Sequence, residues 1–178
     1  LRHTVAQRLA DEGMPENLLG RGMIYAADIT GEKEYVEFVK EWLDVYTMGH
    51  GLYMPIEVDD VASAFSALLF YNRTGDPRYY KGTRRAEDYI RRGAPRLDDG
   101  TIIHQTGNSI WLDTAYMTAP FMSRLALIQK DEDMLDDAAR QIIQIAKHTE
   151  DPDTELSYHM WDPETGHSPE LWARGNGW

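Results

Sequence analysis

The sequence predicts an all-α protein. Between residues 31 and 148 apolar side chains recur at helical intervals, whereas runs that alternate apolar and polar residues are nearly absent. A helical hairpin also repeats along the chain. The 178 residues fit a single domain, 1–178, and an apolar fraction of 42% is sufficient for a sizeable core.

The first predicted helix lies within residues 31–46, which read GEKEYVEFVKEWLDVY. Its apolar residues fall on one face, and Glu and Lys occupy the opposite face. This spacing predicts an amphipathic helix. The apolar positions are Tyr35, Phe38, Val39, Trp42, Leu43 and Tyr46.

More helices are predicted further along the chain. The segment VASAFSALLFYNR, residues 61–73, carries so few charges that we expect it to be buried on most sides. Others are predicted over about 77–92, 110–128 and 132–148. The short GTIIH at 100–104 is expected to pair locally at most, and the pattern indicates no sheet.

A turn recurs at the start of several of these units. TGEKEY begins at Thr30 and TGDPRY at Thr74, and QKDEDM is a weaker third copy. Each unit is expected to hold an inner helix, a turn and a more polar outer helix, in either an open solenoid or a closed ring. The equivalent positions are Gly31, Gly75 and Lys130, followed by Tyr35, Tyr79 and Met134.

The composition excludes several classes of protein. A net charge of −12 argues against a nucleic-acid partner, because phosphate binding needs a basic face. No apolar run approaches the roughly 18 residues that cross a bilayer, so we expect no membrane partner. Because the chain has no cysteine, a disulfide scaffold and cysteine–zinc chemistry are excluded. We also expect neither a metal nor another cofactor. We expect a cytoplasmic protein, although Leu1 in place of methionine leaves an upstream leader open.

Long segments at 47–60, 93–109 and 149–178 hold most of the chemically distinctive side chains. Long loops in compact domains tend to carry function. If these loops emerge on one face, carboxylates, imidazoles and indoles converge on one mouth, a combination that suits sugars. The residues are His50, Asp59, Asp60, His104, His159, Trp161, Trp172 and Arg174, together with Asp113 just inside the next helix.

Two stretches of the chain resemble a known family. SIWLDTAYMTAPFMSRLA (109–126) and YHMWDPETGHSPELWARGNGW (158–178) are similar to the core of glycoside hydrolase family 105, the unsaturated rhamnogalacturonyl hydrolases. That family is related to the unsaturated glucuronyl hydrolases of family 88. The match continues more loosely back to about Arg21.

The resemblance implies an (α/α)6 toroid of six helical hairpins. In the family, WARGNGW lies at mid-chain and leads into another inner helix, so we expect this chain to be about the first half of the ring. Half a ring would leave the apolar faces of 110–128 and 61–71 exposed, and we expect the isolated piece to be inactive.

The resemblance also implies a reaction and an acid. The family removes a 4,5-unsaturated uronic acid from small pectin or rhamnogalacturonan-derived oligosaccharides by hydrating its vinyl ether. Asp113, in WLDTAYM, matches the proton donor, and its apolar neighbours would desolvate the carboxyl group. The plainer interpretation is that Asp113 caps a nearby helix.

A second aspartate of the family corresponds to Asp60, with Asp59 as the neighbouring candidate. Either carboxylate is also a candidate N-cap for the helix that begins near Val61. The family often has small residues and a glycine beyond this aspartate, whereas this chain reads VASAFSA.

The remaining candidates are expected to bind substrate, and His159 is expected either to orient the acid or to contact the uronate. Arg174 is the natural carboxylate clamp, because a guanidinium can grip a carboxylate through two hydrogen bonds. There are plainer alternatives: His159 is a solvated loop histidine, residues 172–178 form a tight turn with core tryptophans, and Tyr25 is a core tyrosine. The residues are His159, His104, Arg174, Trp172, Trp178 and Tyr25.

We expect Asp60, Asp113, His159 and Arg174 to face one cavity, with Trp172 beside them. Two other classes of function stay open. One is a non-catalytic helical-repeat module that binds a peptide or protein. The other is a different toroid enzyme, either a two-carboxylate glycosidase or a sugar epimerase.

Overall fold

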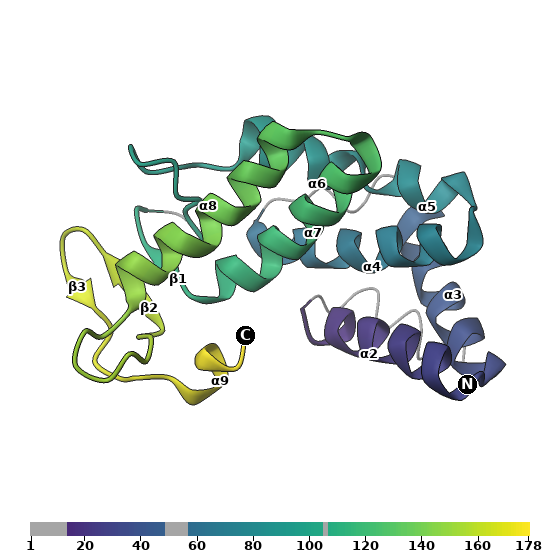
Figure 1. Ribbon diagram of the computed structural model, residues 1–178, viewed down its shortest axis with the longest axis horizontal. Coiled ribbons are helices and arrows are strands. Elements are labelled where there is room, and N and C mark those ends of the chain that lie inside the picture. Colours follow the sequence, from purple (N-terminus) through teal and green to yellow (C-terminus); the bar gives the residue numbers. More distant parts are fainter. Residues whose placement is uncertain (1–13, 49–56, 105–106) are drawn as a thin grey trace. The chain divides into compact units, whose positions relative to one another are not determined.

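The structure is a computed structural model that describes residues 14–48, 57–104 and 107–178 (Figure 1). His50 lies outside these ranges. The chain divides into two compact units, of which the first extends to Asp88 and the second begins at Tyr89. Across the described ranges, every helix is too short or too polar to span a bilayer.

The first unit is helical. Its helices are α2 (Met14–Thr30), α3 (Lys33–Met48), α4 (Val58–Thr74), α5 (Pro77–Gly82) and α6 (Arg84–Asp88). The central helix is α4, which contacts each of the other four. Tyr79 of α5 is buried and donates its hydroxyl to Asp44 of α3 at 2.7 Å, which ties two helices of the core together.

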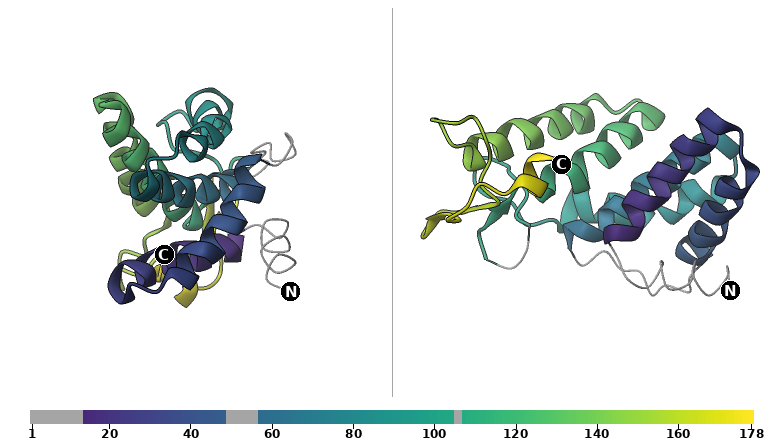
Figure 2. Two further views of the ribbon diagram at one scale, coloured as in Figure 1. Left: turned by 90° about the vertical axis from the view of Figure 1, so that its right-hand side faces the viewer. Right: turned by 90° about the horizontal axis from the view of Figure 1, so that it is seen from below.

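The second unit combines two long helices with a small sheet. It contains the π-helical turn η1 (Tyr89–Gly93), β1 (Ile110–Trp111), α7 (Asp113–Gln129), α8 (Glu132–Thr149), β2 (Met160–Asp162), β3 (Gly166–His167) and α9 (Ala173–Asn176). Helices α7 and α8 pack side by side (Figures 1 and 2). The strands form an antiparallel sheet in the order β1-β2-β3.

The core of the second unit joins α8 to the segment before β1. Ile103, Ile110 and Ile145 pack together there. Beside them, the fully buried Gln141 accepts a hydrogen bond from the backbone N–H of Ile102 at 2.8 Å and donates to the carbonyl of Gly100 at 3.0 Å. A buried amide with both ends satisfied fixes its neighbours, so residues 100–103 are held firmly against α8.

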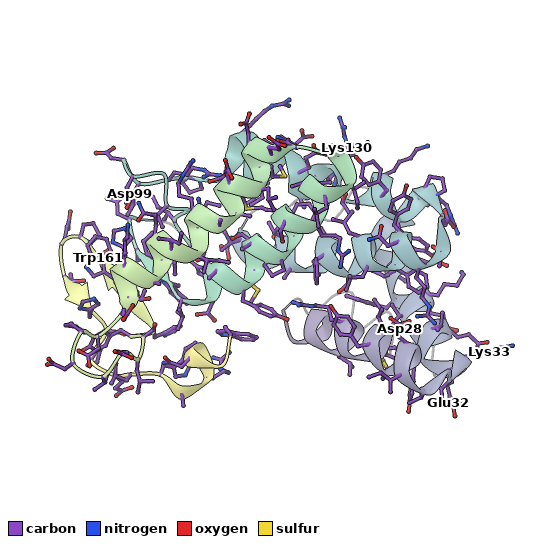
Figure 3. All side chains as sticks on the ribbon, viewed as in Figure 1. Asp28, Glu32, Lys33, Asp99, Lys130 and Trp161 are labelled. Atoms are coloured by element: carbon purple, nitrogen blue, oxygen red, sulfur yellow. The ribbon has the colours of Figure 1, made fainter. Side chains whose placement is uncertain are left out.

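A second set of contacts closes the C-terminal end of α8, near Asp99 and Trp161 (Figure 3). His148 Nε2 lies 2.8 Å from Asp99 Oδ2, and its ring stacks on Trp161 with centroids 4.4 Å apart. Burial opposes ionisation of Asp99, yet hydrogen bonds from Thr101 and His148 hold its pKa below the usual value. This end of α8 is therefore tied both to the preceding loop and to β2.

The predicted repeat is confirmed at its turns. Gly31, Gly75 and Lys130 follow α2, α4 and α7, and all three adopt the left-handed conformation, with φ of 74°, 72° and 57°. The hydroxyls of Thr30 and Thr74 each donate to the carbonyl four residues earlier. Lys130, at the turn between α7 and α8 (Figure 3), thus adopts the left-handed conformation that glycine usually occupies at a helix end, although it has a Cβ.

The predicted helices are confirmed, with shifted ends. The segment at 77–92 is divided into α5, α6 and η1, and the helix predicted from 61 begins at Val58. Helix α2 was not predicted, because Gly20 and Gly22 lower the helical propensity of that stretch. The helix predicted over 110–128 starts at Asp113, since Ile110 and Trp111 form β1.

The expectation that no sheet would form is wrong. Each strand has only two or three residues, too few for an alternating pattern to be visible in the sequence. Of the segment 100–104, Ile102 pairs in isolation with Arg96, as expected for a local contact.

The expected exposure of apolar faces holds only in part for α7 and is wrong for α4. Leu127 of α7 is 64% exposed, and an apolar groove of about 620 Å³ lies between α7 and α8, but Met117, Phe121 and Leu125 are fully buried. By contrast, every residue from Val61 to Phe70 of α4 is buried.

Candidate active site

The register of the small sheet brings two separate segments together in the second unit. Ile110 pairs with Trp161 and Trp111 with Met160. The ladder continues one step further, because the N–H of Leu112 donates to the carbonyl of His159 at 3.0 Å. The residue after Leu112 is Asp113, the first of α7, so the sheet delivers His159 beside that carboxylate.

Asp113 is only 4% exposed, and its two oxygens have different neighbours. Oδ1 accepts a hydrogen bond from the indole N–H of Trp178 at 3.1 Å. Oδ2 lies 3.2 Å from Nε2 of His159. Asp113 Oδ2 and His159 Nε2 are both buried, and within the described part of the chain neither atom has a partner with hydrogen-bond geometry. The pair is therefore in contact without a well-directed hydrogen bond.

Rings form a continuous row beside this carboxylate. His104 stacks on Trp111 with centroids 4.6 Å apart and planes 11° apart. The rings of Trp111 and His159 meet in an edge-type contact with centroids 4.9 Å apart, and the centroids of His159 and Trp172 are 4.0 Å apart. The guanidinium of Arg174 ends the row, with its Cζ 3.8 Å from the centre of the Trp172 ring. Imidazoles, indoles and one guanidinium thus form one row that runs from the buried His104 to the exposed Arg174.

Arg174 is held by aromatic faces. Its Cζ is 5.9 Å from the Trp178 ring in addition to its close contact with Trp172. The residue is exposed, and among the residues described no carboxylate forms an ion pair with it. Its hydrogen-bond donors are consequently available to an external anion.

His104 lies behind the row. It is 3% exposed, and its Nδ1 is 2.9 Å from the hydroxyl of Thr114, the residue after Asp113. Burial lowers the pKa of His104 to about 4, with the nearby Asp113 opposing this effect and His159 adding to it. The ring is therefore neutral at pH 7.

Six of the sequence candidates therefore lie together in the second unit. They are Asp113, His104, His159, Trp172, Arg174 and Trp178. Sequence reasoning did not select Trp111 or Thr114 as site residues. Trp111 had a visible signal, because it stands two residues before Asp113, whereas the contact of Thr114 with His104 had none.

The other two candidates lie in the first unit. Tyr25 is 47% exposed on α2 and so is not a core tyrosine. Asp60 is not the N-cap of α4, since the N-cap is Glu57. Asp60 stands three residues later, where its carboxylate accepts a hydrogen bond from the backbone N–H of Glu57 at 3.4 Å in a capping box. Asp59 is likewise inside the helix.

Comparison with known proteins gives a consistent family. The model of Glycosyl Hydrolase Family 88 matches residues 15–178. The chain is 30% identical over 166 residues to the unsaturated rhamnogalacturonyl hydrolase YesR of Bacillus subtilis, covering 88% of this chain and 48% of that protein. The chain thus spans about half the length of this curated relative.

Solved structures agree with this match. A family 105 glycoside hydrolase from C. acetobutylicum superposes with a TM-score of 0.85 at 26% identity, over 94% of this chain and 51% of that one. A possible member of the same family from Salmonella enterica superposes with a TM-score of 0.86 at 21% identity, over 96% of this chain and 46% of that one. The expected (α/α)6 toroid fold is confirmed, with this chain covering about half of it.

Proposed function

We propose a function from the finding that this chain belongs to glycosyl hydrolase family 88. The protein that contains it removes a 4,5-unsaturated uronic acid from the non-reducing end of small oligosaccharides. The name of its relative YesR supports fragments of rhamnogalacturonan as the substrate class. The family match covers residues 15–178 and so includes both units, which supports a single catalytic domain of which this chain is a part.

The proposed reaction is the hydration of a vinyl ether. An acid places a proton on C4 of the sugar, and water adds its oxygen to C5 and gives up a proton. The C5 hemiketal then opens to a ketone and leaves a hemiacetal at C1. That hemiacetal breaks down to an aldehyde and releases the remaining sugar as an alcohol.

The observation that carries the proposal is the environment of Asp113. One oxygen is held by the Trp178 indole, and the other is buried beside His159 without a directed hydrogen bond. A carboxyl group fixed through one oxygen presents the other in a defined direction, which a proton donor requires. After C4 is protonated, the carboxylate can accept the proton of the attacking water.

His159 supports Asp113 in this scheme. Its Nε2 lies 3.2 Å from the same oxygen that would transfer the proton. An imidazole at that distance can orient the carboxyl group and stabilise the carboxylate that forms when the proton has left.

Arg174 binds the uronate carboxylate in the proposal. The guanidinium is exposed and stands on the faces of Trp172 and Trp178. This arrangement fixes the planar fork while leaving its N–H groups free to grip a carboxylate. Since the whole chain carries a net charge of −12, such a local donor is needed to hold an anionic sugar. Asp60 and Tyr25 stay predictions as further site residues.

The test is turnover of an unsaturated uronyl disaccharide in heavy water by the full-length protein that contains this chain. Loss of the ultraviolet absorbance of the conjugated double bond reports the reaction, and NMR reports where deuterium enters. Hydration by an enzyme-bound acid places deuterium on one face of C4. Direct glycosidic displacement would first release an unsaturated sugar, which labels both faces as it rearranges in solution, and that result would contradict the proposal.

A further inference from the structure

His104 has a structural setting that substrate binding does not explain. Its side chain is 3% exposed, and its recorded ring contacts are with protein side chains. These side chains, Trp111 and Thr114, lie on either side of the proposed acid in the sequence.

The backbone of His104 is well anchored. Just before it, the N–H of Ile103 donates to the carbonyl of Pro95 at 2.9 Å, and Gln141 of α8 holds Ile102. The N–H of His104 itself donates to the carbonyl of Ser109 at 3.2 Å. His104 is thus a fixed point against which neighbouring side chains can be aligned.

From this fixed point, two contacts lead to the reacting groups. The imidazole Nδ1 is 2.9 Å from the hydroxyl of Thr114, in the first turn of α7 directly after Asp113. The flat face of the ring stacks on Trp111, which in turn makes an edge-type contact with His159. The contact with Thr114 therefore constrains Asp113, and the contact with Trp111 constrains His159.

We propose that His104 is a positioning residue, which holds Asp113 and His159 in contact through Thr114 and Trp111. The inference rests on the proposed function for its kinetic consequence, but its geometric consequence is independent of any substrate. The alignment matters because the Asp113–His159 pair is close without a directed hydrogen bond of its own. Its geometry therefore depends on the surrounding contacts.

The charge state of His104 agrees with this role. Burial keeps the ring neutral at pH 7, with a pKa of about 4. A neutral ring can stack on Trp111 and share a hydrogen bond with Thr114 without placing a positive charge next to His159.

The kinetic test, made on the full-length protein that contains this chain, isolates the contact between His104 and Thr114. His104→Phe keeps a flat ring against Trp111 but loses the Thr114 bond, and Thr114→Val loses the same bond from the other side. Each is expected to lower kcat about tenfold with KM within about twofold, because misplacement acts on the transition state more than on binding. Thr114→Ser keeps the hydroxyl and is expected to restore kcat to near the wild-type value.

A matched control comes from the same unit. His148 also pairs through one ring nitrogen, with Asp99, and stacks on a tryptophan, Trp161. His148→Phe therefore makes the same chemical change at a similarly built position outside the proposed site. It is expected to lower stability while leaving kcat unchanged, whereas an equal fall of kcat in this variant would overturn the inference.

A crystallographic measurement decides the geometry without activity. In His104→Phe and Thr114→Val the separation of Asp113 Oδ2 and His159 Nε2 is expected to exceed the 3.2 Å of the native chain and leave contact range. An unchanged separation would overturn the positioning role, whatever the kinetics. If the wild-type protein shows no turnover of the unsaturated disaccharide, the proposed function fails, and this measurement still decides the role of His104.

Discussion

At the scale of single residues, the two oxygens of Asp113 have different tasks. The indole N–H of Trp178 fixes one oxygen, and the second faces His159. This asymmetry distinguishes Asp113 from a helix cap, the plainer interpretation of the sequence. An N-cap carboxylate accepts from backbone N–H groups of its own helix, as Asp131 does from Met134 at the start of α8, whereas the recorded partners of Asp113 are side chains from distant segments.

In the full-length protein that contains this chain, Asp113→Asn is expected to abolish turnover of the unsaturated disaccharide, with a loss of at least about 100-fold in kcat, because an amide cannot deliver the proton. The loss of ultraviolet absorbance measures this. The matched control is Asp153→Asn, the same change at an exposed aspartate of the same unit, which should retain full activity. Equal activity of the Asp113 variant would remove this residue from the mechanism.

Arg174→Gln is expected to raise KM about tenfold or more with little change in kcat. The reason is that charged hydrogen bonds to the uronate contribute roughly 1.5–3 kcal/mol in both the bound state and the transition state. Steady-state kinetics measure the effect. Arg140→Gln, at an exposed arginine on α8, serves as the control. A substrate with its carboxylate esterified should bind both wild type and variant with similar KM, and a persistent difference would argue against the clamp.

At the scale of elements, the long periodic helices could be predicted and the small sheet could not. The helix predicted over 132–148 is α8, Glu132–Thr149, because its one-sided apolar pattern extends over several turns. The strands hold two or three residues each, and their pairing depends on contacts between segments some 50 residues apart. The motifs could therefore identify Asp113 and His159, but the register that joins them appears only in the fold.

The undetected helix α2 offers a paired test of element stability. A Cβ added at Gly22 meets open space, so Gly22→Ala should raise the free energy of unfolding by up to about 1 kcal/mol through helical propensity. A Cβ added at Gly20 would overlap the buried indole of Trp42, so Gly20→Ala should lower it by about 1–3 kcal/mol. Urea unfolding measures both, and two changes of the same sign would contradict the placement of α2 against α3.

At the scale of the whole molecule, acid stability reports on the candidate site. The usual pKa of histidine is 6.5, and burial lowers that of His104 to about 4 in the folded chain. Between these values the unfolded chain binds a proton that the folded chain does not, so the free energy of unfolding falls as the pH falls. The partners of Asp99 and Asp131 lower the pKa of these carboxylates, so their contribution to stability is lost below their usual pKa of 3.8. The pH range of their effect is therefore separate from that of His104.

We therefore expect stability to be constant with respect to His104 above pH 6.5 and to decline by roughly 3 kcal/mol between pH 6.5 and about 4, since one pH unit corresponds to about 1.4 kcal/mol. Urea titrations at a series of pH values measure this. Tryptophan fluorescence is a suitable probe, because four of the five tryptophans lie in the unit that begins at Tyr89. His104→Phe should remove most of this slope, whereas Gly22→Ala should shift stability equally at every pH. A slope that survives in His104→Phe would show that another group takes up the proton.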